Sequence, residues 1–308
     1  MVNIEQGGEN MELDIELVGQ LKRVLAAVEQ ILPQVVEPID WHTAMAASWR
    51  SHSVAGYLEA MPETEATSLD ELLGIDEQKK LVVDNTSQFV HGLPANNVLL
   101  WGSRGTGKSS LVRALLTRYG DEGLRVIQVD KDDLHHLPDI FLQIKACPYR
   151  FLIFCDDLSF EDGEKSYKIL KSALDGAVYA SPKNTLIYVT SNRRHLIPDY
   201  VHDNLGNHMK GGEVRASETI EEKSSLSDRF GLWVSFDSFS QEQYLRVVQQ
   251  CIERLCAEYK QTLPWDEVVE KAAIQWSHDK SKRCGRTASQ FAKRWVGMAL
   301  SQCVVETE

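Results

Sequence analysis

A glycine-rich turn between an apolar strand and a helix constrains this chain more than any other feature of its sequence. Residues 97–101 form the apolar run, the turn GSRGTGKS follows, and the helical pattern SLVRALL comes directly after it. Within the turn, Gly102, Gly107, Lys108 and Ser109 satisfy the spacing GxxxxGK[ST]. A strand, such a turn and a helix in immediate succession predict a P-loop in an α/β protein.

The residue types in the turn suit the binding of phosphate groups. Glycines let the backbone curl so that successive N–H groups face an anion, and the helix N-terminus adds its positive dipole end. Lys108 is expected to reach the β- and γ-phosphates of ATP, and the Ser109 hydroxyl to bind Mg2+. The alternative is a glycine turn that joins the strand to the helix and binds no ligand. The predicted nucleotide-binding residues of the loop are Gly102, Ser103, Arg104, Gly105, Thr106, Gly107, Lys108, Ser109 and Ser110.

The rest of the chain alternates short apolar runs with helical patterns. The runs predicted as strands are 97–101, 124–129, 151–156, 185–191 and 232–236. Continuous apolar runs between helices indicate a parallel sheet that is buried on both faces. Before this core, the patterns in 17–32 and 41–58 predict helices, and after it three amphipathic helices predict a small helical lid. The predicted domains are 1–66, an acidic N-terminal helical region, 67–237, the nucleotide-binding core, and 238–308, the lid.

Acidic side chains follow two of the predicted strands. FLIFCDD ends in Asp156 and Asp157, and we expect Asp156 to hold Mg2+ and Asp157 to orient or deprotonate the attacking water. A helix cap or a solvated loop acid is the alternative for Asp157. A rival acidic set follows the strand at 124–129, namely Asp130, Asp132 and Asp133.

Three further polar residues each have a functional and a structural interpretation. Asn192 ends a strand, where its amide could hold the attacking water or the γ-phosphate, or simply form a turn. Arg229 precedes a strand and could pair with Asp228 or neutralise charge on a γ-phosphate. Arg286 starts the last helix and could reach the phosphates or belong to a basic surface with Lys280 and its neighbours. The polar stretch 202–227 is long enough to be a functional or mobile loop.

Composition limits the class of protein. The formal charge is −12, and residues 1–66 carry three basic against 11 acidic side chains, so about −8 of it lies there. The chain therefore lacks the basic footprint of a general nucleic-acid binder. No apolar run approaches the roughly 20 residues of a membrane-spanning helix. Six cysteines without CxxC pairs give no zinc or disulfide signal, so we expect a cytoplasmic protein with no membrane partner.

The motifs taken in order resemble the AAA+ ATPases, and in particular a family of uncharacterised bacterial AAA+ ATP-binding proteins known as a domain of unknown function. The resemblance runs from about residue 69 to 304. It is carried by LLGIDEQKK, GLPANNVLLWGSRGTGKSSLV, PYRFLIFCDDLSFE, YVTSNRRHLIP, EEKSSLSDRFGLWVSF and CGRTASQFAKRW. The Asp156–Asp157 pair is also similar to the replication initiator and helicase-loader branch, whereas many AAA+ enzymes carry Glu at the second position.

The resemblance implies a fold and roles for residues. The fold is an αβα P-loop core with a five-stranded parallel sheet in the order 5-1-4-3-2, a helical lid and an N-terminal helical segment. The resemblance implies that Asn192 is the first nucleotide sensor and Arg286 the second. It also implies that Arg229 is an arginine finger that acts on a neighbouring subunit. Gly74 and Ile75 match the segment that lines the adenine. A finger acting in trans implies a homo-oligomer.

Three classes of function remain open. The first is an ATPase that uses Mg-ATP to remodel or load a macromolecular partner, either a protein or, by analogy alone, DNA. The second is a nucleotide-gated binding module with little hydrolysis, which the Asp at position 157 and the acidic N-terminal region favour. A small-molecule P-loop kinase is the third, and the sequence shows no acceptor pocket for it.

Overall fold

The computed structural model describes residues 17–24, 38–51, 56–62, 66–160, 165–174, 181–193, 196, 226 and 228–305. Their centre is a seven-stranded sheet in the order β2-β1-β4-β5-β6-β3-β7, in which every pair except β1–β2 is parallel. Its strands are β1 (Ala46–Ser51), β2 (Gly56–Ala60), β3 (Val98–Gly102), β4 (Leu124–Gln128), β5 (Arg150–Cys155), β6 (Thr185–Ser191) and β7 (Leu232–Phe236).

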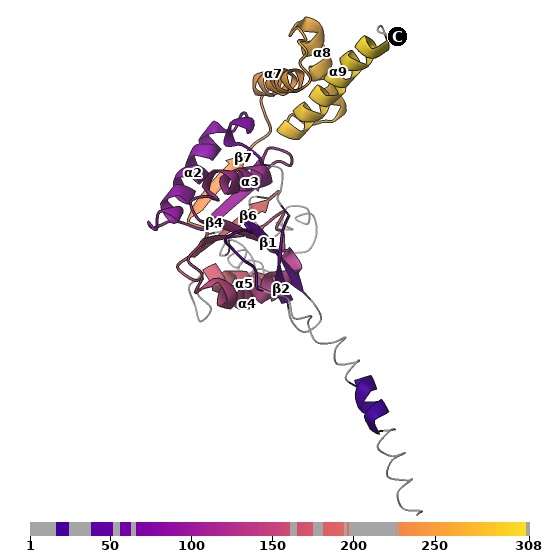
Figure 1. The fold of residues 1–308 in the computed structure, drawn as a ribbon. Coiled ribbons are helices and arrows are strands. Elements are labelled where there is room, and N and C mark those ends of the chain that lie inside the picture. Colours follow the sequence, from indigo (N-terminus) through magenta and orange to yellow (C-terminus); the bar gives the residue numbers. More distant parts are fainter. Residues whose placement is uncertain are drawn as a thin grey trace, which may run out of the picture.

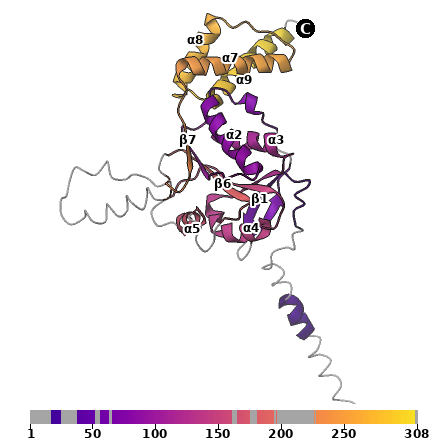
Figure 2. The same ribbon diagram turned by 90° about the vertical axis from the view of Figure 1, so that its left-hand side faces the viewer.

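Helices cover both faces of the sheet and form a separate layer above it (Figures 1 and 2). Helices α2 and α3 pack on one face, α4 and α5 on the other, and α7, α8 and α9 form the lid. The helices are α2 (Asp76–Val90), α3 (Lys108–Tyr119), α4 (Leu137–Ile144), α5 (Lys165–Leu174), α7 (Gln241–Glu258), α8 (Glu267–Asp279) and α9 (Gly285–Val305), with short 3-10 helices η1 (Leu69–Glu71) and η2 (Lys131–His136).

The central strands are buried on both faces because their side chains alternate between two apolar cores. In β3, Val98 and Leu100 face the core under α2 and α3, whereas Leu99 faces the core under α4 and α5. This two-residue period is what a strand imposes on its side chains. The apolar runs in the sequence reflect burial on both sides of a parallel sheet.

The predicted sheet is correct in type and too small in extent. Its five strands correspond to β3, β4, β5, β6 and β7, and these lie in the order β7-β3-β6-β5-β4, which is 5-1-4-3-2 in their own numbering. Two strands, β1 and β2, extend the sheet beyond β4. The division of the chain at residues 66 and 237 stays a prediction, although these added strands belong to the core sheet.

The prediction of a helix over residues 41–58 is wrong, because this segment forms β1 and β2. Ala47 and Trp49 are buried on one face of β1, and Trp49 pairs with Leu58 across the antiparallel hairpin. Gly56 belongs to this arrangement, since a Cβ there would lie 2.2 Å from the Trp49 ring. The alanines favour a helix locally, but pairing of β1 with the edge of β4 decides the outcome.

The N-terminal helix prediction is confirmed for the described part. Residues 17–24 are helical, and the apolar side chains there are exposed. The continuation to residue 32 and nearly all of the loop 202–227 lie outside the described residues.

Candidate functional site

The P-loop curls through three glycines with left-handed backbone. The φ angles of Gly102, Gly105 and Gly107 are 126°, 81° and 107°, and Gly107 is the N-cap of α3. The Thr106 hydroxyl donates to the Ser103 carbonyl at 2.8 Å and closes the turn. The loop therefore presents the N-terminus of α3 to the cavity, which is the arrangement that binds an anion.

Gly102 leaves no room for a side chain. A Cβ there would lie 2.2 Å from the Phe236 carbonyl oxygen, which already accepts from the Ser103 N–H at 2.8 Å. We expect Gly102→Ala to destabilise the protein by about 3 kcal/mol, since it adds backbone strain and pushes β3 and β7 apart.

Urea unfolding measures this effect, and Gly297→Ala in α9 is the matched control. Nothing lies within 4 Å of a Cβ at Gly297, so alanine there should stabilise the helix by about 0.5–1 kcal/mol. Equal unfolding midpoints for Gly102→Ala and the wild type would contradict the role of Gly102.

Lys108 lies almost completely buried inside the loop. Its Nζ donates to the carbonyls of Gly102 and Ser103, both at 2.8 Å, and lies 3.5 Å from Oδ1 of Asn192. Burial lowers the pKa of Lys108, and the charges of Asp156 and Asp157 oppose that shift. A buried ammonium held among carbonyls is suited to binding an anionic phosphate.

Asp156 contacts the side chains that a magnesium site requires. The Ser109 hydroxyl donates to Asp156 Oδ1 at 2.6 Å, and the Thr190 hydroxyl donates to the same oxygen at 2.5 Å. The hydroxyl and the carboxylate predicted to hold Mg2+ are therefore neighbours. In the sequence, Thr190 is recognisable only as the end of a strand, so its role as the buried support of Asp156 was missed.

Asp157 is held by three neighbours. Its N–H donates to the Thr190 hydroxyl at 2.8 Å, the Asn192 amide donates to Oδ1, and Arg104 donates to Oδ2 at 3.3 Å. The Asn192 amide has its oxygen toward Lys108 and its nitrogen toward Asp157, the orientation that both partners require. Asp157, Asn192 and Lys108 thus form one polar network at the carboxyl ends of β3, β5 and β6.

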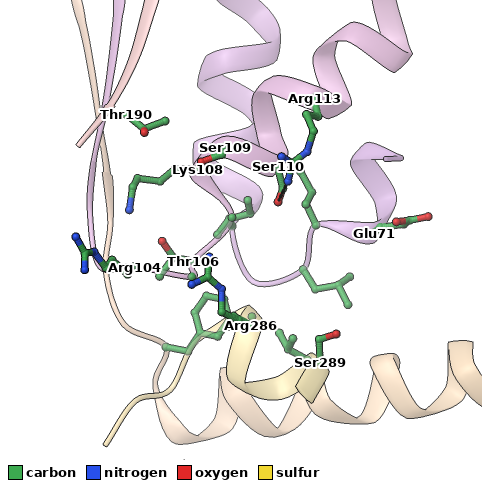
Figure 3. Close-up of a pocket in the computed structure, with 18 of the residues that line it drawn as sticks. Glu71, Arg104, Thr106, Lys108, Ser109, Ser110, Arg113, Thr190, Arg286 and Ser289 are labelled. Carbon is green, nitrogen blue, oxygen red and sulfur yellow. Dashed lines mark hydrogen bonds between the residues drawn. The ribbon is translucent and has the colours of Figure 1, made fainter. Parts of the chain in front are cut away.

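A cavity of about 620 Å³ extends from this network to the lid (Figure 3). In Figure 3, Arg104 and Lys108 lie on the Thr190 side of the loop, and Glu71, Arg113 and Ser289 lie on the other side. The end of the cavity toward Glu71 combines apolar side chains with an ion pair of 3.2 Å between Glu71 and Arg254. Its lining residues include Leu72, Leu73, Ile75, Phe239, Val247 and Cys251.

Most residues of this end of the cavity were missed in the sequence. Ile75 was predicted and lines the cavity, whereas Gly74 does not line it; its φ of 75° shapes the turn before Ile75. Leu72 and Leu73 precede that pair in the LLGI motif, which could have indicated them. Phe239 and Cys251 carry no local signal, because only the fold brings the lid segment to η1.

The lid contacts the P-loop directly through the start of α9. The Arg286 N–H donates to the Gly105 carbonyl at 3.1 Å, and the Arg286 side chain lines the cavity. A Cβ at Gly105 would lie 2.9 Å from Cys284 Sγ, so glycine is needed for this close approach. The start of α9 therefore places Arg286 beside the phosphate loop, and its role as second sensor stays a prediction.

Besides Gly74, the predicted loop residues Gly102 and Ser103 do not line the cavity, and two further sets of predicted residues lie away from it. Arg229 is half-buried before β7, and the register of β7 with β3 puts it at the end of the sheet opposite the loop. A strand of five residues spans about 16 Å, so Arg229 lies far from its own P-loop. The rival acids follow β4, which is separated from β3 by β5 and β6, and none of them lines the cavity: Asp130, Asp132 and Asp133.

The donors fit a nucleotide with Mg2+. The cavity has a size typical of small-molecule sites. No cluster of three or more His, Cys, Asp or Glu side chains that could hold a metal occurs within the described part of the chain. A hydroxyl and one carboxylate are nonetheless enough for Mg2+, which keeps several waters and takes its other ligands from phosphates.

The model of a family described as protein of unknown function (DUF815) matches residues 42–299. The chain belongs to this family. No curated protein sequence matches this member of the DUF815 family.

Solved structures of Thermotoga maritima RuvB are similar to this DUF815 protein. A proline-to-glycine mutant of RuvB has a TM-score of 0.53 at 16% identity, covering 77% of this chain and 68% of its own. A lysine-to-arginine mutant of RuvB has a TM-score of 0.51 at 15% identity, and the match covers 76% of this chain and 66% of the mutant's chain. A third RuvB structure, described as a Holliday junction branch migration motor, has a TM-score of 0.49 at 17% identity. This match covers 76% of this chain and 66% of the RuvB chain. At these identities the two matches with TM-scores above 0.5 show the fold alone, a RuvB-like α/β fold.

Within the described ranges, no helix of this DUF815 protein is both long and apolar enough to cross a membrane.

Proposed function

We propose that this protein is an AAA+ ATPase that binds Mg-ATP and hydrolyses it to act on a macromolecular partner, in an assembly of several copies. The observation that carries the proposal is the network of Lys108, Asp156, Asp157 and Asn192 around the P-loop, beside a cavity of nucleotide size. These are the groups that hold phosphates, bind Mg2+ and position water in phosphoryl transfer.

Hydrolysis assigns a separate task to each group. Asp157, with Asn192, orients a water whose oxygen forms a bond to the γ-phosphorus while the bond to the β,γ-bridging oxygen breaks. The water's proton passes to Asp157, and ADP is the leaving group. Mg2+ held by Ser109 and Asp156 would neutralise phosphate charge. Lys108 and Arg286 stabilise the phosphate oxygens from the loop and from the lid.

Arg229 completes the site of a neighbouring copy in this proposal. Its place at the far end of the sheet prevents it from reaching its own loop. A site shared between copies makes activity depend on assembly. The sequence likeness to the initiator and loader branch, and RuvB's description as a branch migration motor, leave protein and DNA as alternative partners.

The test is phosphate release from ATP over a wide range of protein concentration, with Mg2+ and with EDTA. We expect release only with Mg2+ and a specific activity that rises with concentration, because assembly brings Arg229 to the neighbouring site. Specific activity that stays constant at all concentrations would contradict a shared site.

A second candidate function is a nucleotide-gated binding module. It is favoured by the contacts of Asp157, whose two carboxylate oxygens are both engaged by side chains. Tight ATP binding without phosphate release under any of these conditions would select it over the ATPase.

A further inference from the structure

The P-loop carries an arginine that contacts the carboxylate assigned to activate water. Arg104 lies between Gly102 and Gly105, and its guanidinium is 3.3 Å from Asp157 Oδ2. Asn192 holds the other carboxylate oxygen. Each carboxylate oxygen of Asp157 is therefore engaged by one side chain, so a water that binds there shares its acceptor oxygen with Asn192 or Arg104.

The ion pair is placed where it can be broken at little cost. The Arg104 and Asp157 side chains are 64% and 57% exposed, and exposed pairs contribute only about 0–1 kcal/mol. Arg104 also lines the cavity. A γ-phosphate carries more charge than a carboxylate and offers several oxygens to a planar guanidinium, so it competes well for Arg104.

Arg104 is the partner that is able to move. Asp157 has a left-handed backbone with φ of 52°, fixed by its N–H bond to the Thr190 hydroxyl and by the Leu158 N–H bond to the Thr190 carbonyl at 2.7 Å. Thr190 is itself buried. The carboxylate is thus anchored, whereas the long arginine side chain is exposed on the loop that receives the phosphates.

Arg104 also acts electrostatically at the phosphate-binding lysine. Burial is the main cause that lowers the pKa of Lys108, and the positive charge of Arg104 adds to that shift. The guanidinium is therefore within electrostatic reach of the position where Lys108 meets a phosphate.

We propose that Arg104 is a γ-phosphate sensor. Its guanidinium pairs with Asp157 until a nucleoside triphosphate binds, and the side chain then moves to pair with the γ-phosphate instead. The inference rests on the proposed nucleotide function and adds a regulatory residue to it. ADP, which lacks the γ-phosphate, leaves the Arg104–Asp157 pair intact. The pair thereby couples the state of the nucleotide to the water-activating group.

The experiment is a double-mutant cycle in binding, which needs no hydrolysis. The non-hydrolysable analogue AMP-PNP and ADP are titrated by calorimetry with Mg2+ into the wild type, Arg104→Ala, Asp157→Asn and the double variant. Arg104→Ala should weaken AMP-PNP binding by about tenfold, the loss of one charged hydrogen bond, and change ADP binding by less than about twofold.

The Asp157→Asn variant tests directly whether Asp157 and the γ-phosphate compete for Arg104. It removes the carboxylate that competes for Arg104, so AMP-PNP binding should tighten by about threefold in the wild-type background. In the Arg104→Ala background the same change should have a smaller effect, because only the charge repulsion between Asp157 and the γ-phosphate is then removed. Arg104→Lys should restore part of the preference for the triphosphate, because it keeps the charge.

Arg118→Ala is the matched control. Arg118 is similarly exposed on the far end of α3 and pairs with Glu122 at 2.8 Å, so its loss should leave both affinities unchanged. An equal effect of Asp157→Asn in both backgrounds, or an equal effect of Arg104→Ala on both nucleotides, would overturn the sensor. Phosphate release that fails while this coupling is present would instead remove only the hydrolytic part of the proposed function. A wild type that binds neither nucleotide would remove both proposals.

Discussion

Replacing Lys108 by alanine should lower phosphate release by at least about 100-fold, the effect of removing a preorganised charged donor from a transition state. Lys108 is the buried cation of the loop, and its Nζ lies among the Gly102 and Ser103 carbonyls beside Asn192. We expect ATP binding by this variant to weaken as well, because the same ammonium binds the ground-state phosphates.

The measurement is phosphate release at saturating Mg-ATP, with circular dichroism to verify the fold. Lys271→Ala is the control, since Lys271 is exposed on α8 and pairs with Glu267 at 2.8 Å. Wild-type turnover by Lys108→Ala would show that the P-loop is not the site of hydrolysis.

Replacing Arg229 by alanine should lower phosphate release by about 10³-fold, as expected for a lost arginine finger, while ATP still binds. The loss of hydrolysis is expected without a loss of ATP binding, because Arg229 precedes β7 at the end of the sheet that is opposite the loop. Its own nucleotide site remains complete without it.

A mixture of Arg229→Ala and Lys108→Ala proteins distinguishes action in trans from action in cis. An Arg229→Ala copy keeps a complete P-loop, and a Lys108→Ala neighbour supplies the missing arginine, so the mixture should exceed both components. Arg246→Ala on the exposed face of α7 is the control. A mixture whose activity is only the average of its components would contradict an arginine finger acting between copies.

The predicted residues that the structure brings together are those encoded by short, contiguous patterns. The P-loop and Asp156 each sit at the end of an apolar run that forms a buried strand. Because parallel strands place their carboxyl ends at one edge, sequence position alone brings Lys108, Asp156 and Asn192 to the same edge. Their contacts confirm this placement.

The parts that were missed depend on residues far apart in the sequence. The end of the cavity toward Glu71 joins Leu72 near η1 to Phe239 and Cys251 near and within α7. The contact of Arg104 with Asp157 joins residues 53 positions apart. No local period reports such a meeting, since it is set by how the lid and the strands pack.

The sequence by itself determined the P-loop, the parallel core and its helical lid, because buried strands and amphipathic helices leave apolar periods that can be read locally. Only the tertiary structure decided that residues 46–51 and 56–60 are strands, since the edge of β4 supplies hydrogen bonds that overcome the helical preference of the alanines. It also decided that Arg104 contacts Asp157 and that Arg229 lies away from its own loop. Both depend on strand order and register, which are long-range properties of the fold.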